Sequence, residues 1–330
     1  MLNVGLLGAG RIGRVHAVNV AGHPGSALVA VSDVHAPAAE SLAARFGAAV
    51  RSSRDIVADP AIDAVLVATS TDTHSDLIEA ATASGKAVLC EKPVDLSLAR
   101  ARACRAAVAE TDRPVMIGFN RRFDRGLAAM KAAIDAGSVG RAELLSITSF
   151  DPAPPPIAYI EVSGGLFRDM TIHDLDLARW FMGGSPATVT AKAAALVDPA
   201  IGAAGDVDTA VLTLTWEDGR MAVIRNSRRA AYGYDQRVEL LGSEGLLQAE
   251  NVAESNLVRS TAAGVVGAKP LHFFLERYMA AFAAEWDAFV EAVSEGRTPP
   301  VTLDDGVEAL AVAEAAAESH RTGRTVELGS

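Results

Sequence analysis

The chain has 330 residues, of which 50% are hydrophobic, and a formal net charge of −11 at pH 7. A chain of this length exceeds the comfortable size of one hydrophobic core, so two domains are expected. The acidic balance argues against binding to nucleic acid or to an anionic membrane, because both require a basic surface. No stretch approaches the roughly 18 apolar residues of a membrane-spanning helix, and no basic segment precedes the first apolar residues. We therefore expect a soluble cytoplasmic protein.

A glycine-rich motif directly follows the first apolar run. Residues 4–7 predict a strand, and the next six residues read GAGRIG. Between a strand and a helix, this spacing is typical of a dinucleotide-binding turn. Gly8 allows the tight turn, Gly10 lets the backbone approach a pyrophosphate, and Gly13 lets the following helix pack closely. The first N–H groups of that helix would face the phosphates. The expected cofactor contacts here are Gly8, Gly10, Arg11, Ile12 and Gly13.

An acidic residue stands at the distance that such a motif requires. Asp33 closes the second apolar run, residues 28–31, and lies twenty positions after Gly13. A carboxylate at this point accepts both hydroxyls of an adenine ribose and repels a 2′-phosphate, which favours NAD over NADP. The strand before the turn, the helix after it and the acid at this distance together favour nucleotide binding over a purely structural glycine turn. The remaining alternative is a doubly wound domain that binds another nucleotide.

Strands and helices then alternate, which predicts a parallel sheet wound on both faces. The expected helices are 36–46, 76–84 and 97–110, and the expected strands are 64–69, 87–90 and 115–118. We assign residues 1–119 to an N-terminal Rossmann domain. Such sheets bind ligands beyond the carboxyl ends of their strands. The expected cofactor contacts in that crevice are Ser70, Thr71, His74, Glu91 and Lys92.

From residue 120 the pattern changes to that of an α/β domain with a large, open, mostly antiparallel sheet. We expect one helix through residue 136, hairpin turns at 217–219 and 242–245, and a final helix at 305–320 that could pack on either domain. Helices on one face of the sheet would leave its other face for a partner, so we expect self-association. The expected strands of this domain, residues 120–330, are 143–150, 209–216, 221–226 and 237–241.

Three residues are candidates for acid–base chemistry. The apolar spacing of residues 165–180 is helical, and it places Asp169 and His173 on one face, with their Cβ atoms about 5–6 Å apart. The carboxylate can hold the imidazole tautomer or stabilise its charged form. Lys92 follows a sheet strand, where its ammonium would lie near substrate and nicotinamide. The simpler alternatives are a solvated Asp and His pair and a surface lysine before a turn.

In this order, GAGRIG, Glu91-Lys92-Pro93 and the pair Asp169 and His173 resemble the Gfo/Idh/MocA family of oxidoreductases across nearly the whole chain. Within the family, residues 118–124, 165–180 and 232–235 are similar to bacterial inositol 2-dehydrogenases. The resemblance implies NAD as cofactor and a Rossmann domain followed by an α/β domain. It also implies a homotetramer assembled through the open sheets.

The resemblance further implies a role for each candidate. His173 would be the general base that takes the hydroxyl proton, Asp169 would orient His173 or relay its proton, and Lys92 would hydrogen-bond the reacting oxygen. A positioned base typically contributes about 10² to 10⁴ in rate, and a nearby cation stabilises developing negative charge. Because nicotinamide carries the redox step, no metal is required.

Cys90 and Cys104 are expected to be small buried hydrophobes.

Polar side chains of the second domain should recognise the substrate. By motif position the candidates are Asn120, Asp151 and Tyr234, besides Lys92, Asp169 and His173. Each has a structural alternative, since Asn120 could cap a helix, Asp151 could begin a turn, and Tyr234 could only pack on the sheet. Phe150 stands where close inositol dehydrogenase relatives are expected to carry a polar or basic residue, and an aromatic ring there would reshape the pocket.

The expected function is NAD-dependent oxidation of a secondary hydroxyl of a cyclic polyol, with myo-inositol converted to 2-keto-myo-inositol. One alternative is a scyllo-inositol or pyranose sugar dehydrogenase. Another is a regulator that senses NAD without catalysis. Lys92, Asp169 and His173 argue against the regulator, because sensing needs neither a base nor a carboxylate and cation beside it.

Overall fold

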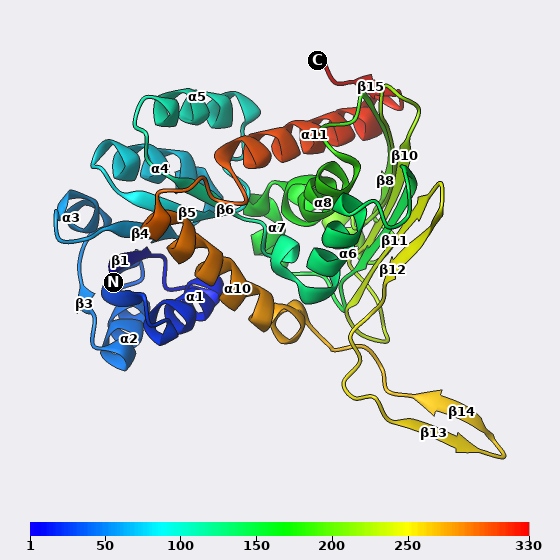
Figure 1. The fold of residues 1–330 in the computed structure, drawn as a ribbon, viewed down its shortest axis with the longest axis horizontal. Coiled ribbons are helices and arrows are strands. Elements are labelled where there is room, and N and C mark those ends of the chain that lie inside the picture. The colour runs from blue at the N-terminus through cyan, green and yellow to red at the C-terminus, as the bar shows by residue number, and fades with distance from the viewer. Residues whose placement is uncertain (330) are drawn as a thin grey trace. The chain divides into compact units, whose positions relative to one another are not determined.

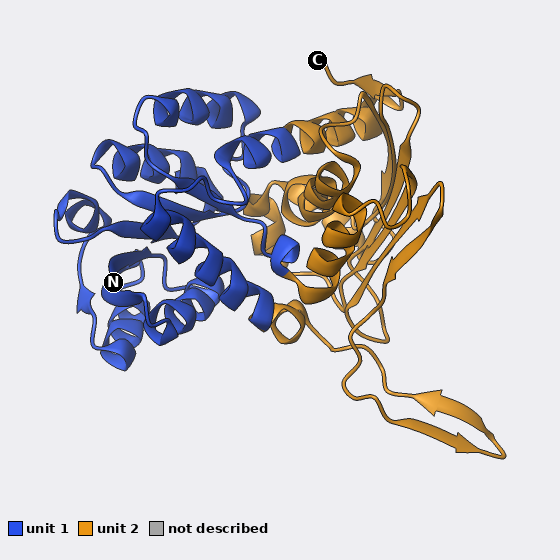
Figure 2. Ribbon diagram, in the orientation of Figure 1, with its two compact units in different colours: residues 1–123, 280–310 blue, residues 124–279, 311–330 orange. Residues whose placement is uncertain are grey.

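The structure, a computed structural model, describes residues 1–329 and contains two compact units (Figure 2). Unit 1 comprises Met1–Phe123 and Ala280–Leu310, and unit 2 comprises Asp124–Met279 and the chain from Ala311 onward. Two long helices each belong to both units. Helix α10 (Phe274–Glu295) begins in unit 2 and ends in unit 1, whereas α11 (Leu303–Thr322) begins in unit 1 and ends in unit 2.

The sheet of unit 1 has six parallel strands in the order β3-β2-β1-β4-β5-β6 (Figure 1). Its central strands are continuous apolar runs buried on both faces, as a parallel sheet covered by helices requires. The strand order reverses between β1 and β4, and ligands bind such sheets beyond the carboxyl ends at this point. The strands are β1 (Leu2–Leu7), β2 (Ser26–Ser32), β3 (Ala49–Val50), β4 (Ala64–Val67), β5 (Ala87–Glu91) and β6 (Val115–Gly118).

The helices of unit 1 begin and end at residues suited to those positions. The side chain of Ser52 accepts the Asp55 N–H at the start of α3, and Ser97 accepts the Arg100 N–H at the start of α5. Helix α2 ends at Gly47, which is left-handed with φ 69°. On α10, buried Trp286 donates from Nε1 to Ser26 Oγ at 3.0 Å, which anchors this helix to β2. The helices are α1 (Arg11–Gly22), α2 (Ala36–Phe46), α3 (Ser53–Ala58), α4 (His74–Ala83) and α5 (Leu98–Ala109).

The sheet of unit 2 has seven strands in the order β12-β11-β7-β10-β9-β8-β15. All neighbouring strands are antiparallel except β7 and β10, which are parallel. The expected open, mostly antiparallel sheet is therefore confirmed. Its strands are β7 (Ala142–Phe150), β8 (Thr188–Ala194), β9 (Thr209–Thr215), β10 (Met221–Ser227), β11 (Asp235–Gly242), β12 (Gly245–Ala249) and β15 (Val326–Glu327).

Helices cover one face of this sheet (Figure 1). Alternate residues such as Leu212 and Ile224 point toward them and are fully buried. Residues of opposite parity form the open face, where Val211, Met221, Leu241 and Leu246 are 43–49% exposed. The helices of unit 2, besides parts of α10 and α11, are α6 (Arg125–Asp135), α7 (Ile157–Ser163), α8 (Ile172–Met182) and α9 (Pro199–Ala203).

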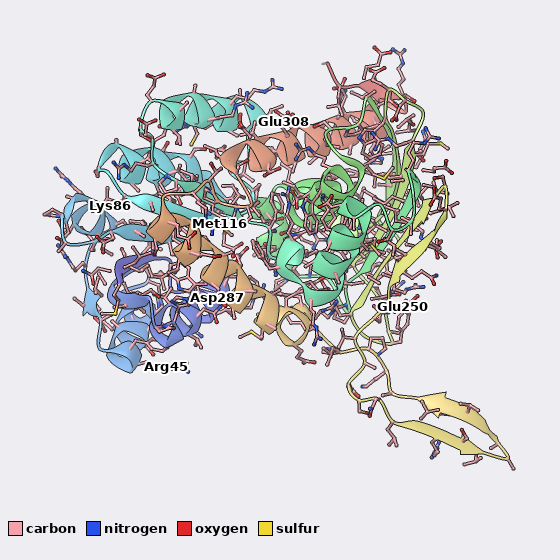
Figure 3. All side chains as sticks on the ribbon, viewed as in Figure 1. Arg45, Lys86, Met116, Glu250, Asp287 and Glu308 are labelled. Atoms are coloured by element: carbon pink, nitrogen blue, oxygen red, sulfur yellow. The ribbon has the colours of Figure 1, made fainter. Side chains whose placement is uncertain are left out.

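A hairpin of β13 (Val258–Thr261) and β14 (Gly264–Gly267) projects from unit 2. Every residue of both strands is exposed, and side chains stand out from the hairpin with no other described segment beside it (Figure 3). An isolated two-stranded hairpin is at best marginally stable in water. The sequence reasoning did not predict this element. Among the described residues, no helix combines the length and hydropathy needed to cross a membrane.

Candidate functional site

The three glycines of the turn after β1 differ in what a Cβ atom would meet at each position. Gly8 has a φ of +100°, and a Cβ there would lie 2.2 Å from the carbonyl oxygen of Ala68. A Cβ on Gly13 would lie 2.0 Å from the carbonyl oxygen of Gly8. A Cβ on Gly10 would meet no described atom within 4 Å. Backbone packing thus requires the first and third glycines, whereas the exposed second glycine leaves room for a ligand.

The N-terminus of α1 provides donors at that opening. Gly10 is the N-cap of α1, no described side chain caps the helix, and its first turn holds no acidic residue. The first N–H groups of a helix have no partner within the helix, and they attract anions. The turn itself is fixed to β2, since the Gly8 N–H donates to Ser32 O at 2.8 Å. These groups fit a pyrophosphate.

Asp33 lies at the carboxyl end of β2, next to the turn. Its Oδ2 accepts the Ala9 N–H at 2.6 Å, and its Oδ1 accepts the His35 N–H at 2.7 Å. A carboxylate oxygen accepts more than one hydrogen bond, so both can still bind ribose hydroxyls. The structure therefore brings Asp33 and the glycine turn together, as the spacing predicted.

The residues after β4 form the next part of this edge. Ser70 is exposed and precedes a 3₁₀ turn, Thr71–Thr73, and His74 begins α4. The His74 ring is buried, with Nδ1 2.8 Å from Pro93 O and Nε2 3.2 Å from Thr69 O. Burial lowers the pKa of His74, which favours the neutral ring, and a neutral ring donates to one of the two carbonyls at a time. His74 ties the end of β4 to the segment that follows Lys92.

At the end of β5, Glu91 is held by a buried histidine. His16 Nε2 of α1 lies 2.7 Å from Glu91 Oε1. Glu91 also lies beside Gly118 of β6, where a Cβ would come within 3.2 Å of its carboxyl group. The next residue is half-buried Lys92, and the Lys92–Pro93 peptide bond is cis. Lys92 thus follows a strand end that is fixed by a side-chain bond and by close packing.

A second carboxyl group, Glu285 of α10, lies near this pair. Glu285 is fully buried, and neither of its oxygens accepts a hydrogen bond from a described residue. Burial, followed by the negative charge of Glu91, raises the pKa of Glu285 well above its ordinary value. The sequence reasoning missed Glu285. The available signal was one acidic residue within the apolar face of a long helix, beside Phe282 and Trp286.

In unit 2, the segment that carries Asp169 and His173 is not one regular α-helix. Phe167–Thr171 is a π-helical turn, and α8 starts at Ile172. The expectation of a continuous α-helix over residues 165–180 is wrong here. Tertiary bonds fix both ends of the turn, because the Leu166 N–H donates to Asp206 and the Thr171 hydroxyl donates to Asn226. Apolar periodicity cannot indicate such bonds, and π turns are frequent at functional sites.

A buried polar network fixes the residues on both sides of His173. Asp174 is fully buried; its Oδ1 accepts Ser149 Oγ at 2.6 Å and its Oδ2 accepts Asn226 Nδ2 at 2.7 Å. Asn226 Oδ1 in turn accepts the Thr171 hydroxyl at 2.7 Å. Ser149 belongs to β7 and Asn226 to β10. Half-buried His173 is therefore carried by a segment that is locked to two strands.

Asp169 is held at both of its oxygens. Tyr159 of α7 donates from its hydroxyl to Oδ1 at 2.9 Å, and Arg228, which follows β10, donates from Nη2 to Oδ2 at 3.1 Å. Neither donor was predicted from the sequence. Tyr159 follows a proline-rich stretch that gives no periodicity, and Arg228 is one of two adjacent arginines.

The pairing of β7 with β10 and β11 places further candidate substrate-binding residues at one edge of the sheet. Phe150 pairs with both Ser227 and Asp235 across its two neighbouring strands. Asp151, which follows Phe150, donates its N–H to Ser227 O at 2.8 Å. Tyr234, which precedes Asp235, is 5% exposed and packs edge-on against Tyr278.

The predicted substrate contacts are thus divided between the two units. Lys92 and buried Asn120 belong to unit 1. Those in unit 2 are Asp151, Asp169, His173 and Tyr234. The structure brings the last four to the same sheet edge and the helical segment packed on it. Their role in substrate binding stays a prediction.

Comparison with known proteins extends along the whole chain. Residues 2–119 match the model of the oxidoreductase family with an NAD-binding Rossmann fold, and residues 127–248 match the GFO/IDH/MocA C-terminal domain. An inositol 2-dehydrogenase of Rhizobium meliloti is 48% identical over 325 residues, 98% of each chain. A myo-inositol 2-dehydrogenase of Thermotoga maritima is 44% identical over 329 residues, 99% of this chain and 98% of that protein. The crystal structure of scyllo-inositol dehydrogenase from Lactobacillus casei, with bound NAD(H) and scyllo-inositol, aligns with a TM-score of 0.93 at 30% identity and covers 100% of both chains.

The fold, the glycine turn and these matches define an NAD-dependent oxidoreductase that acts on CH–OH groups. The chain belongs to the Gfo/Idh/MocA family. The fold class, the family and the cofactor expected from the sequence are therefore confirmed. The opening at Gly10, the N-terminal end of α1 and the carboxylate of Asp33 are the features of this structure that fit NAD.

The glycine turn gives a direct test of cofactor binding. We expect Gly10→Ala to leave the thermal midpoint within about 2 °C, because its Cβ meets open space, while weakening NADH binding about tenfold or more. Gly13→Ala should instead lower the midpoint by about 5 °C or more, because its Cβ overlaps the Gly8 carbonyl. Thermal melting and fluorescence titration with NADH measure both effects. Unchanged NADH affinity in Gly10→Ala would contradict this placement of the pyrophosphate.

Glu285 predicts a pH dependence of stability. Because its pKa is raised in the folded state, the folded protein binds this proton more tightly than the unfolded chain does, and stability falls as pH rises above the ordinary range of glutamate. Glu285→Gln removes this loss. Its stability relative to wild type should rise by up to about 1.4 kcal/mol for each pH unit between the two pKa values.

Thermal midpoints of both proteins from pH 5 to pH 9 measure the effect. Glu291→Gln, an exposed position on the same helix, is the matched control and should show no such trend. A constant difference between Glu285→Gln and wild type over this pH range would show that Glu285 is ionised like an exposed glutamate.

Proposed function

We propose that this protein oxidises a secondary hydroxyl of a cyclic polyol with NAD, and that its substrate is myo-inositol, which becomes 2-keto-myo-inositol. One observation carries the proposal. A histidine and a fixed carboxylate occur on a segment locked to the sheet, in a chain that matches an inositol 2-dehydrogenase at 48% identity over 98% of its length. We infer the class of substrate, a cyclic polyol, from the relatives, and the proton transfer from the residues of this chain.

In the proposed reaction, the substrate loses a proton from its hydroxyl and a hydride from the same carbon. His173 takes the proton. Lys92 donates a hydrogen bond from its ammonium to the same oxygen and stabilises the negative charge that develops there. Asp169 holds the imidazole in the orientation that this transfer needs. NAD, when bound, supplies the hydride acceptor.

Recognition of the polyol requires polar groups around its other hydroxyls. We assign this role to Asn120, Asp151 and Tyr234, besides the three residues that act on the reacting carbon. The ring of Tyr234 is buried against Tyr278, and we assign the contact with substrate to its hydroxyl. Phe150 ends β7 next to Asp151, and its ring would narrow this part of the pocket.

Scyllo-inositol is the second candidate substrate. The Lactobacillus casei dehydrogenase that binds it shares this fold over the full chain. The two inositols differ only in the configuration at the oxidised carbon, so the same base and lysine could serve both. Because hydrogen and hydroxyl exchange places at that carbon, the two rings must be held in different orientations to present the same C–H bond to NAD. Discrimination then depends on the contacts made by the remaining hydroxyls in each orientation.

Substrate and cofactor are tested together by following NADH or NADPH formation with myo-inositol, scyllo-inositol and glucose. We expect oxidation of myo-inositol with NAD, and a fall in kcat of about 10²-fold or more in Lys92→Ala. Lys269→Ala, at an exposed lysine of the hairpin region, is the control and should be as active as wild type. The substrate assignment fails if NADH binds but no polyol is oxidised.

We further propose a homotetramer in the cytoplasm, where NAD is regenerated. Two features support self-association: the open face with its exposed apolar residues, and the hairpin, in which Val258 and Val265 are 57% and 73% exposed. Apolar patches of this kind mark interaction surfaces.

Light scattering coupled to size-exclusion chromatography measures the assembly. Met221→Glu, on the open face, should reduce the mass toward that of a dimer or monomer. Met279→Glu, at an exposed methionine of α10 outside the sheet, should leave the mass unchanged. A wild-type protein that elutes as a monomer would contradict the proposal.

A further inference from the structure

Arg228 is a buried cation whose place in the structure depends on Asp169. Only 1% of its side chain is exposed, and its ion pair among the described residues is with Asp169, with Nη2 3.1 Å from Oδ2. Its Nε meets no acceptor among these residues, and its backbone N–H donates to Asp208 O at 2.8 Å. A buried charge is costly unless it is paired, so this guanidinium requires an ionised Asp169.

The second oxygen of Asp169 is also occupied by a donor. Tyr159 donates its hydroxyl proton to Oδ1 at 2.9 Å, from an element that is separate from the strand that precedes Arg228. Hydrogen bonds to a charged acceptor are about twice as strong as neutral ones, and they fix its orientation. Asp169 is thus held from two directions, and 13% of its side chain remains exposed.

We propose that Arg228 and Tyr159 are positioning residues that keep Asp169 an anion, so that Asp169 orients His173 and does not take its proton. A proton on Asp169 would leave the guanidinium of Arg228 buried beside a neutral acid. A guanidinium does not lose its proton in a protein, so the buried cation would stay charged and unpaired. The proton taken by His173 therefore leaves toward solvent. This inference rests on the proposed function and decides between the two roles, orienting and relaying, that the resemblance allowed for Asp169.

The adjacent arginine provides a matched control. Arg229 is exposed, and it donates its N–H to Ser227 Oγ at 3.2 Å and Nη1 to Val197 O at 3.4 Å. It makes no ion pair among the described residues. Arg229→Ala thus removes an arginine side chain from the same chain segment and leaves the contacts of Asp169 unchanged.

The experiment compares Arg228→Ala, Arg228→Lys, Tyr159→Phe and Arg229→Ala by kcat and by KM for NAD and myo-inositol. We expect Arg228→Ala to lower kcat about 10²-fold with KM for NAD within about twofold, because the base loses its fixed partner. Arg228→Lys, or low millimolar guanidinium added to Arg228→Ala, should restore at least about tenfold of that loss. Tyr159→Phe should cost only a few-fold, since a neutral donor is lost.

The thermal midpoint provides a second test that does not depend on catalysis. The thermal midpoint is measured for Arg228→Ala, Asp169→Asn and the double variant, and the shift caused by Arg228→Ala should be smaller in the Asp169→Asn background. Wild-type kcat in Arg228→Ala, or a loss that neither lysine nor guanidinium restores, overturns the proposal.

If wild type oxidises no polyol, it is the proposed function that fails. The ion pair is then tested only by the thermal midpoints of the two single variants and the double variant. If the two single shifts add up to the shift of the double variant, the coupling between Arg228 and Asp169 is absent and the proposal is overturned.

Discussion

In both units, parallel pairing brings the carboxyl ends of neighbouring strands to one edge of a sheet. In unit 1 this edge collects the glycine turn after β1, Asp33 after β2 and Lys92 after β5. In unit 2 the sheet is mostly antiparallel, yet its one parallel pair, β7 and β10, ends at Asp151 and Arg228. The candidates at these strand ends lie together for this reason, because residues after parallel strands become neighbours however far apart they lie in the sequence.

The buried acidic groups near these edges are stabilised in different ways. Asp174 is satisfied by two neutral donors, Asp169 by a cation and a phenol, and Glu91 by a histidine. Glu285 has no such partner among the described residues, and burial raises its pKa, which favours the uncharged acid. Each arrangement avoids an unpaired buried charge, which would be costly. The hydrogen bonds hold these carboxylates, and the segments that carry them, in defined positions.

The sequence predicted the features that depend on local pattern. The glycine turn with Asp33 was predictable because its glycines stand at fixed spacings between a strand and a helix, and the spacing of the acid is set by one helix and one strand. Lys92 was predictable because it directly follows a strand. The helical period around His173 indicated the right kind of element, and only its π turn was missed.

The missed features depend on contacts between distant segments. Arg228 and Tyr159 become relevant only when β10 and α7 are brought to Asp169. Glu285 becomes unusual only because α10 is buried in unit 1, and this helix was itself not predicted. The exposed hairpin lacks a buried face, so no alternation of apolar and polar residues marked it.

In the proposed reaction a hydride moves directly from the polyol carbon to NAD while His173 removes the hydroxyl proton. Oxidation of myo-inositol that carries deuterium on C-2, in ordinary water and with mass analysis of the NADH formed, follows the hydride. We expect the NADH to carry the deuterium. Unlabelled NADH, with the deuterium released into water, would show that the hydrogen does not pass directly to NAD.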